Sequence, residues 1–125
     1  MAVDKHKRLF DLLFTKTEAG ELEWQETAEK GDYLASFSNY SIEITRYEAQ
    51  ENESTIVRLA IRGADGQVIE WVTDIEVGER IATQTEKNVF YRKTEALYEM
   101  VRRKVLGADK ALDAILAELD DDIPF

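Results

Sequence analysis

The last six residues of the sequence combine groups from which a peptide-recognition motif can be built. They are Asp120, Asp121, Asp122, Ile123, Pro124 and Phe125, and we call them the tip. We expect Phe125 to carry both an aromatic ring and the free carboxylate of the chain, which a guanidinium group or a backbone nest can bind. Pro124 restricts its own backbone and that of Ile123, so docking orders fewer degrees of freedom. The tip is therefore predicted to enter a pocket with a basic rim.

The tip closely resembles the acidic C-terminal tail of bacterial single-stranded DNA-binding protein, through which that protein recruits replication, recombination and repair enzymes. The resemblance is confined to residues 120–125. In that family the tail follows an oligonucleotide-binding β-barrel and a long linker rich in Gly, Gln and Pro, and residues 1–119 show neither feature. The resemblance implies DNA metabolism in a bacterium or phage, and partner proteins with a basic tail-binding pocket. The alternatives are an acidic helix end, a solubility tail and an engineered tail.

The rest of the sequence offers little material for catalysis or metal binding. It lacks a Gly-rich phosphate loop, a nucleophile elbow and the H-x-E or C-x-x-C spacing of metal sites. His6 is the only histidine, and without cysteine neither a thiolate metal site nor a disulfide framework is expected. We expect a non-enzymatic protein with no catalytic residue, metal or cofactor. The weaker alternative is a magnesium-dependent nuclease built on Asp65, Glu70 and Asp74.

Two groups of side chains are candidates for contact with single-stranded DNA, which proteins bind through basic tracks and aromatic platforms. The first group lies on a predicted helix and consists of Arg92, Lys93, Arg102, Arg103 and Lys104. The second lies on predicted strands and consists of Tyr47, Arg58, Arg62 and Trp71. Because the strands belong to an acidic part of the chain, the helix group ranks first. Its alternative is a solvated face whose cations pair with the protein's own carboxylates.

Charge is unevenly distributed along this chain, whose formal net charge is −10. Residues 17–79 carry four basic and fifteen acidic side chains, whereas residues 80–104 carry seven basic and three acidic ones. An acidic surface can mimic phosphate toward a basic partner. The first hypothesis is a DNA-metabolism protein that binds or accompanies single-stranded DNA and recruits replication, recombination or repair enzymes through its tip. The second is an acidic adaptor or decoy that occupies the tail-binding pocket of such an enzyme, or mimics DNA, without binding DNA itself. The short connection to the tip favours this hypothesis, since a recruiting tail benefits from a long tether.

Periodicity and capping residues predict the elements that must position these groups. Asp4 is expected to cap a helix that extends to about Ala19, with Gly20 just beyond its end. Strands are predicted around Leu22–Trp24 and over Tyr33–Phe37, Tyr40–Glu48, Thr55–Arg62 and Gln67–Thr73. Residues 38–39 and 63–66 are predicted hairpin turns. Both faces of the second hairpin carry apolar residues, so either a helix covers part of its second face or an aromatic patch is left open.

The segment Asp74–Gly78 is expected to be a connection or a short edge strand. A long helix is predicted from about Gly78 or Thr85 to Leu106, followed by a last helix that is capped by Asp109. The last helix carries an apolar stripe and runs directly into the tip.

These elements predict an α+β fold: an N-terminal helix, an antiparallel meander of four or five strands and two C-terminal helices, with the helices packed on one face of the sheet. Residues 1–119 are expected to form one domain and residues 120–125 an acidic peptide tip. The sequence shows no signal peptide and no membrane span, so a cytoplasmic protein is expected. An oligomer is compatible with this pattern.

Overall fold

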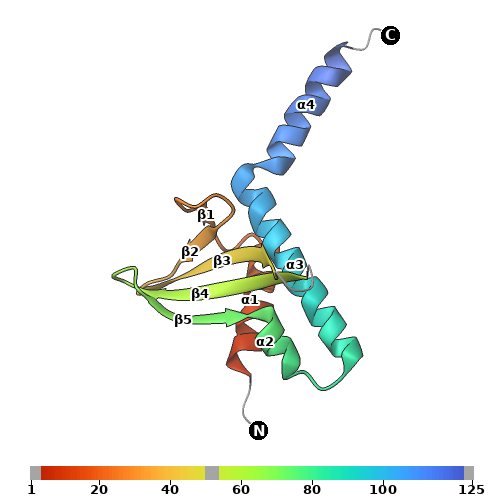
Figure 1. The fold of residues 1–125 in the computed structure, drawn as a ribbon. Helices are drawn as coiled ribbons and strands as arrows, with labels where there is room; N and C mark the ends of the chain where they lie inside the picture. Colours follow the sequence, from red (N-terminus) through yellow and green to blue (C-terminus); the bar gives the residue numbers. More distant parts are fainter. Residues whose placement is uncertain (1–3, 50–53, 123–125) are drawn as a thin grey trace.

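One helix, five consecutive strands and three helices follow one another along the chain, in the order that the sequence predicts except for the short helix after the last strand. The computed structural model describes residues 4–49 and 54–122, with side chains as far as Asp120. The elements are α1 (Lys5–Glu18), β1 (Gln25–Glu26), β2 (Tyr33–Ser36), β3 (Tyr40–Glu48), β4 (Thr55–Gly63), β5 (Val68–Thr73), α2 (Asp74–Glu79), α3 (Gln84–Leu106) and α4 (Ala108–Asp122). The strands form one antiparallel sheet in the order β1-β2-β3-β4-β5 (Figure 1). The predicted α+β class and the meander are confirmed.

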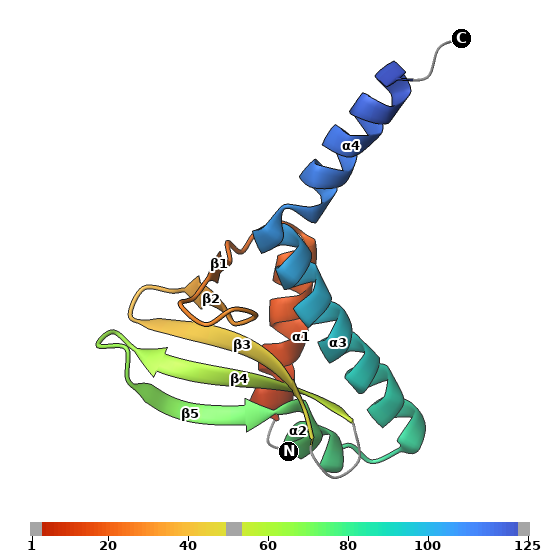
Figure 2. The ribbon, with the colours of Figure 1, turned by 45° about the horizontal axis from the view of Figure 1, so that its top comes forward.

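The core lies between one face of the sheet and the helices α1 and α3, with α2 packed beside α3 (Figure 2). Phe10 of α1 meets Phe90 of α3 edge to face, with ring centroids 5.5 Å apart. Ile44, Val57, Leu59 and Leu97 are fully buried in this layer. Each such side chain contributes about 1.5–3 kcal/mol through burial of apolar surface. The period-two alternation of β3 and β4 thus places their apolar side chains against the helices, as predicted.

The N-terminal helix begins at the predicted cap. One oxygen of Asp4 accepts hydrogen bonds from the backbone N–H groups of His6 and Lys7, each at 3.1 Å. The guanidinium of Arg80 also donates to Asp4, with Nε 2.9 Å from Oδ2, and this contact holds the pKa of Asp4 at about 2. Gly20 follows the helix end at φ +75°, a conformation that favours glycine.

The first strand begins at Gln25, directly after the segment Leu22–Trp24 around which a strand was predicted. β1 pairs Gln25 with Leu34 and Glu26 with Tyr33, and Leu22–Trp24 precede it. Trp24 is buried, and its indole N–H donates to Thr17 Oγ1 at 3.0 Å. The apolar residues that suggested a strand therefore pack against α1 instead of pairing in the sheet.

The segment that follows β5 is a helix, so the prediction of a connection or edge strand over Asp74–Gly78 is wrong. Thr73 Oγ1 accepts from the backbone N–H of Glu76 at 3.1 Å, and a carboxylate oxygen of Glu76 accepts from the backbone N–H of Thr73 at 3.2 Å. These reciprocal bonds form a capping box, which starts α2 directly at the end of the strand. A helix of one and a half turns is too short for apolar periodicity to show in a sequence.

The last helix, α4, leaves the body of the molecule (Figures 1 and 2). Its residues from Asp109 to Asp120 are all exposed, so the prediction that both C-terminal helices pack on the sheet is wrong for α4. Asp109 lies in its first turn and is not its cap. In the described part of the chain, no helix combines the length and the apolar character needed to cross a membrane.

A buried carboxylate joins β4, α2 and α3. Asp74 accepts from the backbone N–H of Val57 (3.1 Å, Oδ1) and from the hydroxyl of Thr94 (2.7 Å, Oδ2). Burial raises the pKa of Asp74 above its ordinary value of 3.8, although these two hydrogen bonds oppose the rise. The hydrogen bonds of Asp74 thus satisfy polar groups of the core, whereas its burial disfavours the charged form of the carboxyl.

The substitution Asp74→Asn tests this balance. Because the folded-state pKa is raised, the stability linked to protonation of Asp74 is fully present below its unfolded pKa and is lost as pH rises through the folded value. We expect the unfolding free energy of Asp74→Asn, relative to wild type, to increase as pH rises above the ordinary pKa of an aspartate, as measured by urea denaturation. Thr94→Val keeps the carboxylate but removes a hydrogen bond that opposes the rise of its pKa, so its stability should fall with pH more than that of wild type. A relative stability of Asp74→Asn that falls with pH would contradict the raised pKa.

Candidate functional site

The sheet face that is turned away from α1 and α3 carries aromatic side chains beside an arginine. Tyr47 of β3, Arg58 of β4 and Trp71 of β5 lie on this face, and we call them the aromatic face. Arg58 is paired across the strands with Thr45 and Thr73, so that Tyr47 and Trp71 are its diagonal neighbours. Of the two outcomes that the sequence allowed for the second face of the β4–β5 hairpin, an open aromatic patch is the one observed.

The guanidinium of Arg58 contacts both rings. Its central carbon lies 5.5 Å from the Tyr47 ring centroid and 5.4 Å from the Trp71 ring centroid, which are cation–π distances. Trp71 is 58% exposed and Tyr47 is 39% exposed. Among the residues that the structure describes, Nε of Arg58 is a buried atom without a hydrogen-bond partner. The face therefore combines two accessible rings with the positive charge of a guanidinium that lies against both of them.

The neighbours of the aromatic face are partly acidic. Arg62 donates to Glu43 Oε1 at 3.2 Å and to the backbone carbonyl of Gly66 at 2.8 Å, so its charge is compensated within the protein. Burial is the main cause that raises the pKa of Asp32, with further increases from the charges of Glu43 and Glu29. The positive charge of Arg58 acts on the same carboxyl in the opposite direction and lowers the pKa of Asp32, so Arg58 also has an acidic neighbour.

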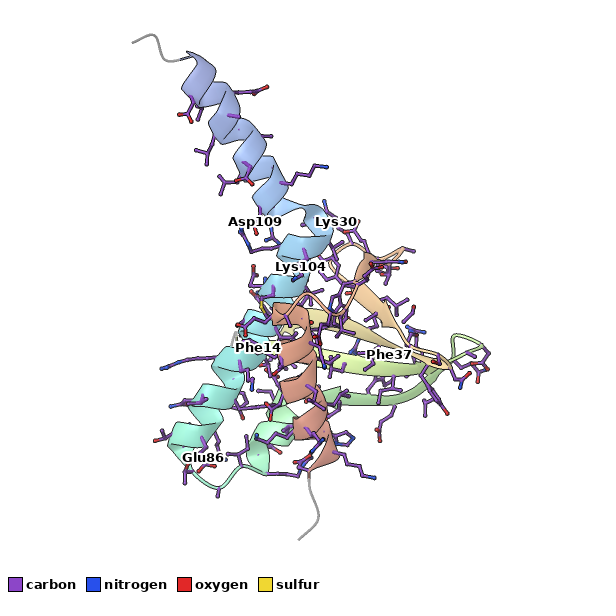
Figure 3. All side chains as sticks on the ribbon, turned by 180° about the vertical axis from the view of Figure 1, so that it is seen from behind. Phe14, Lys30, Phe37, Glu86, Lys104 and Asp109 are labelled. Atoms are coloured by element: carbon purple, nitrogen blue, oxygen red, sulfur yellow. The ribbon has the colours of Figure 1, made fainter. Side chains whose placement is uncertain are left out.

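The five basic residues of α3 that the sequence singled out, Arg92, Lys93, Arg102, Arg103 and Lys104, do not form one cationic stripe. At 3.6 residues per turn they are spread over about half of the helix circumference. Three of them pair with carboxylates of the protein: Lys93 with Asp11 (3.2 Å), Arg102 with Glu99 (3.6 Å) and Arg103 with Asp109. Figure 3 shows Asp109 beside the end of α3 that carries Lys104.

In the described ranges, Arg92 and Lys104 are exposed and make no ion pair. The geometry therefore favours the aromatic face over α3 as a surface for stacking and phosphate contact, which reverses the order drawn from the sequence. The two aromatic residues and the arginine can be seen in the sequence. That they lie next to one another follows only from the register of β3, β4 and β5.

The tip begins inside α4, because the helix continues to Asp122. Asp120 is exposed, and residues 123–125 lie outside the described residues. A helix of 15 residues extends about 22 Å, so α4 carries its acidic end well away from the sheet.

The residues considered for a nuclease do not converge. Asp65 accepts from the backbone N–H of Gln67 in the β4–β5 turn, Glu70 contacts His6 at 3.1 Å, and Asp74 is buried. Within residues 4–49 and 54–122, no three potential metal ligands lie together.

The contacts of Arg58 predict that it contributes little to stability. Arg58→Met keeps an unbranched stem between the rings and should change the unfolding free energy by less than about 1 kcal/mol, since only cation–π contacts are lost. The matched substitution Arg46→Met should cost more, because it leaves Glu95 and Glu99 without the guanidinium that contacts them at 3.3 and 2.9 Å. Urea denaturation of both variants measures this. A larger loss for Arg58→Met would make Arg58 a structural residue.

Comparison with protein-family models, with curated proteins and with solved structures found no match, so the assignment of a function depends on the geometry of the aromatic face and of α4.

Proposed function

We propose that this protein is a non-enzymatic adaptor of DNA metabolism that presents its tip to an enzyme with a tail-binding pocket. The observation that carries the proposal is the projection of α4, which holds the start of the tip away from the body (Figure 1). Partners can reach such a segment from several sides without a clash with the sheet.

The chemistry of the tip supports the same conclusion. Carboxylates that extend α4 would steer the tip toward a basic rim, whereas the ring and terminal carboxylate of Phe125 would fill the pocket. This division of roles depends on Phe125 ending the chain, as expected from the sequence. It predicts that one residue dominates the affinity, since buried aromatic anchors outweigh charges at an interface rim.

Direct binding of single-stranded DNA is a second candidate function, and the aromatic face favours it. Exposed rings allow bases of any type to stack, and stacking contributes about 1–3 kcal/mol per base. The guanidinium of Arg58, which lies within cation–π distance of both rings, would add a positive charge that attracts the phosphates of a bound strand. With DNA bound there, the protein would link single-stranded DNA to the enzyme held by the tip. Without DNA binding, the alternative is a decoy that occupies the tail-binding pocket.

Removal of Phe125 tests the role of the tip. We expect deletion of Phe125 to weaken binding to a tail-binding partner by more than about 2 kcal/mol, whereas Asp120→Asn should cost less than about 1 kcal/mol. Partners captured from a bacterial lysate by the wild-type protein should be released by the free hexapeptide of the tip. The same peptide without phenylalanine serves as the control. Unchanged capture by the truncated protein would refute recruitment through the tip.

A titration with labelled oligo-dT tests the aromatic face. We expect Trp71→Ala and Arg58→Met each to weaken binding by about 1–3 kcal/mol, and the binding of wild type to weaken steeply as salt increases. Ile69→Ala, an exposed apolar residue of β5 outside the aromatic face, is the matched control and should have little effect. Lack of wild-type binding at low salt would remove this function and leave the decoy.

A further inference from the structure

Helix α4 exposes a stripe of apolar side chains that the rest of the chain does not cover. Leu112, Ile115, Leu116 and Leu119 follow one another at the spacing of a single helix face. Each of them is between 49% and 54% exposed. A continuous apolar stripe on a solvated helix is typical of an element that packs against another surface.

A groove on the same chain matches the apolar stripe of α4 in its apolar lining and in the spacing of its residues. It lies beside α1, has a volume of about 250 Å³ and is lined by Leu9, Leu12, Leu13, Lys16, Leu22 and Phe37. Leu12 and Phe37 are each 45% exposed at its surface. Figure 3 looks onto α1 with Phe37 beside it, and α4 points away from this region. The four lining residues of α1 follow the same helical spacing as the stripe of α4 and span a comparable length.

The charges around the two surfaces are opposite. α1 carries four basic and two acidic side chains, whereas α4 carries one basic and six acidic ones. Lys5 and Arg8 are exposed near the start of α1 and form no ion pair within the described chain. Glu118 and Asp120 lie near the end of α4. An antiparallel arrangement of α1 and α4 would therefore bring basic and acidic ends together, while two α4 helices placed side by side would repel each other.

The corner between α3 and α4 keeps α4 away from the groove of its own chain. Gly107 adopts φ +68°, and its N–H bonds to the carbonyls of Arg103 and Lys104. The N–H of Ala111 bonds back to the carbonyl of Gly107, and Arg103 pairs with Asp109. A fold-back of α4 would break these contacts, whereas a second copy could reach the groove without changing them.

We propose that the protein forms a reciprocal dimer in which α4 of each copy occupies the α1 groove of the other, antiparallel to α1. Each copy supplies one stripe and one groove, so the interface is closed and two-fold symmetric. Both apolar stripes, one from each copy, are buried in the same dimer. The basic start of each α1 faces the acidic end of the other copy's α4.

Sedimentation equilibrium with three variants tests the dimer. The wild-type protein should show a monomer–dimer equilibrium, and Leu12→Glu or Ile115→Glu should each raise the dissociation constant on the order of tenfold or more. Ile69→Glu removes an exposed apolar side chain elsewhere and should have no effect. A mixture of Leu12→Glu and Ile115→Glu chains should recover part of the affinity, since one stripe and one groove remain intact. A monomer at all concentrations, or weakening by Ile115→Glu without weakening by Leu12→Glu, would overturn the proposal.

Crosslinking distinguishes exchange between copies from closure within one chain. The protein has no cysteine, so Leu12→Cys and Ile115→Cys provide single reactive sites. When the two variants are mixed, a flexible bis-maleimide should join the different chains more efficiently than the control pair Ile69→Cys and Ile115→Cys. Equal yields for the two pairs would refute the contact. A chain with both substitutions that crosslinks only within itself would show closure on its own groove and would equally overturn the proposal.

Discussion

The edge-to-face contact between Phe10 and Phe90 joins α1 to α3 and closes the one apolar layer of this protein. Side chains of a strand alternate between its two faces, so a layer of helices can cover only half of them. Helices α1 and α3, which Phe10 and Phe90 join, together cover one face of the sheet. The other face and the last helix are left to contact solvent, and both proposed functions use these uncovered surfaces.

On the sheet face that the helices leave uncovered, the pairing of individual charged side chains affects the attraction of phosphate more than the net charge of the strands does. The strands belong to the most acidic part of the chain, which would repel phosphate if its charges acted as a uniform surface. Glu43, however, is engaged by Arg62, whereas Arg58 contacts the rings of Tyr47 and Trp71. A cation held by aromatic rings keeps its charge available to a ligand, because the rings supply attraction without neutralising it. On α3 the opposite holds, since three of the five candidate cations, Lys93, Arg102 and Arg103, are paired with carboxylates.

The two proposals that involve α4 draw on different sides of its chemistry. Recruitment uses the tip beyond the helix, whereas the dimer buries the apolar stripe of Leu112, Ile115, Leu116 and Leu119 and sets the acidic end of α4 against the basic start of α1 in the other copy. The corner at Gly107 serves both, because it directs α4 outward in a defined orientation. The acidic residues of α4 would also keep two such helices from pairing directly, which leaves the apolar groove beside α1, with the basic start of that helix next to it, as the complementary surface.

Local physical chemistry in the sequence was enough to predict the cap at Asp4, the β4–β5 turn and the alternating strands, since each depends on near neighbours along the chain. The α+β class followed from these elements. Tertiary structure alone decided that Tyr47, Arg58 and Trp71 meet, because they come from three strands whose register no spacing reveals. It also decided that α4 stands apart, since a periodic stripe identifies the apolar face of a helix but not the surface that covers it. Contacts between distant segments depend on their mutual packing, and a pattern along one segment does not contain that information.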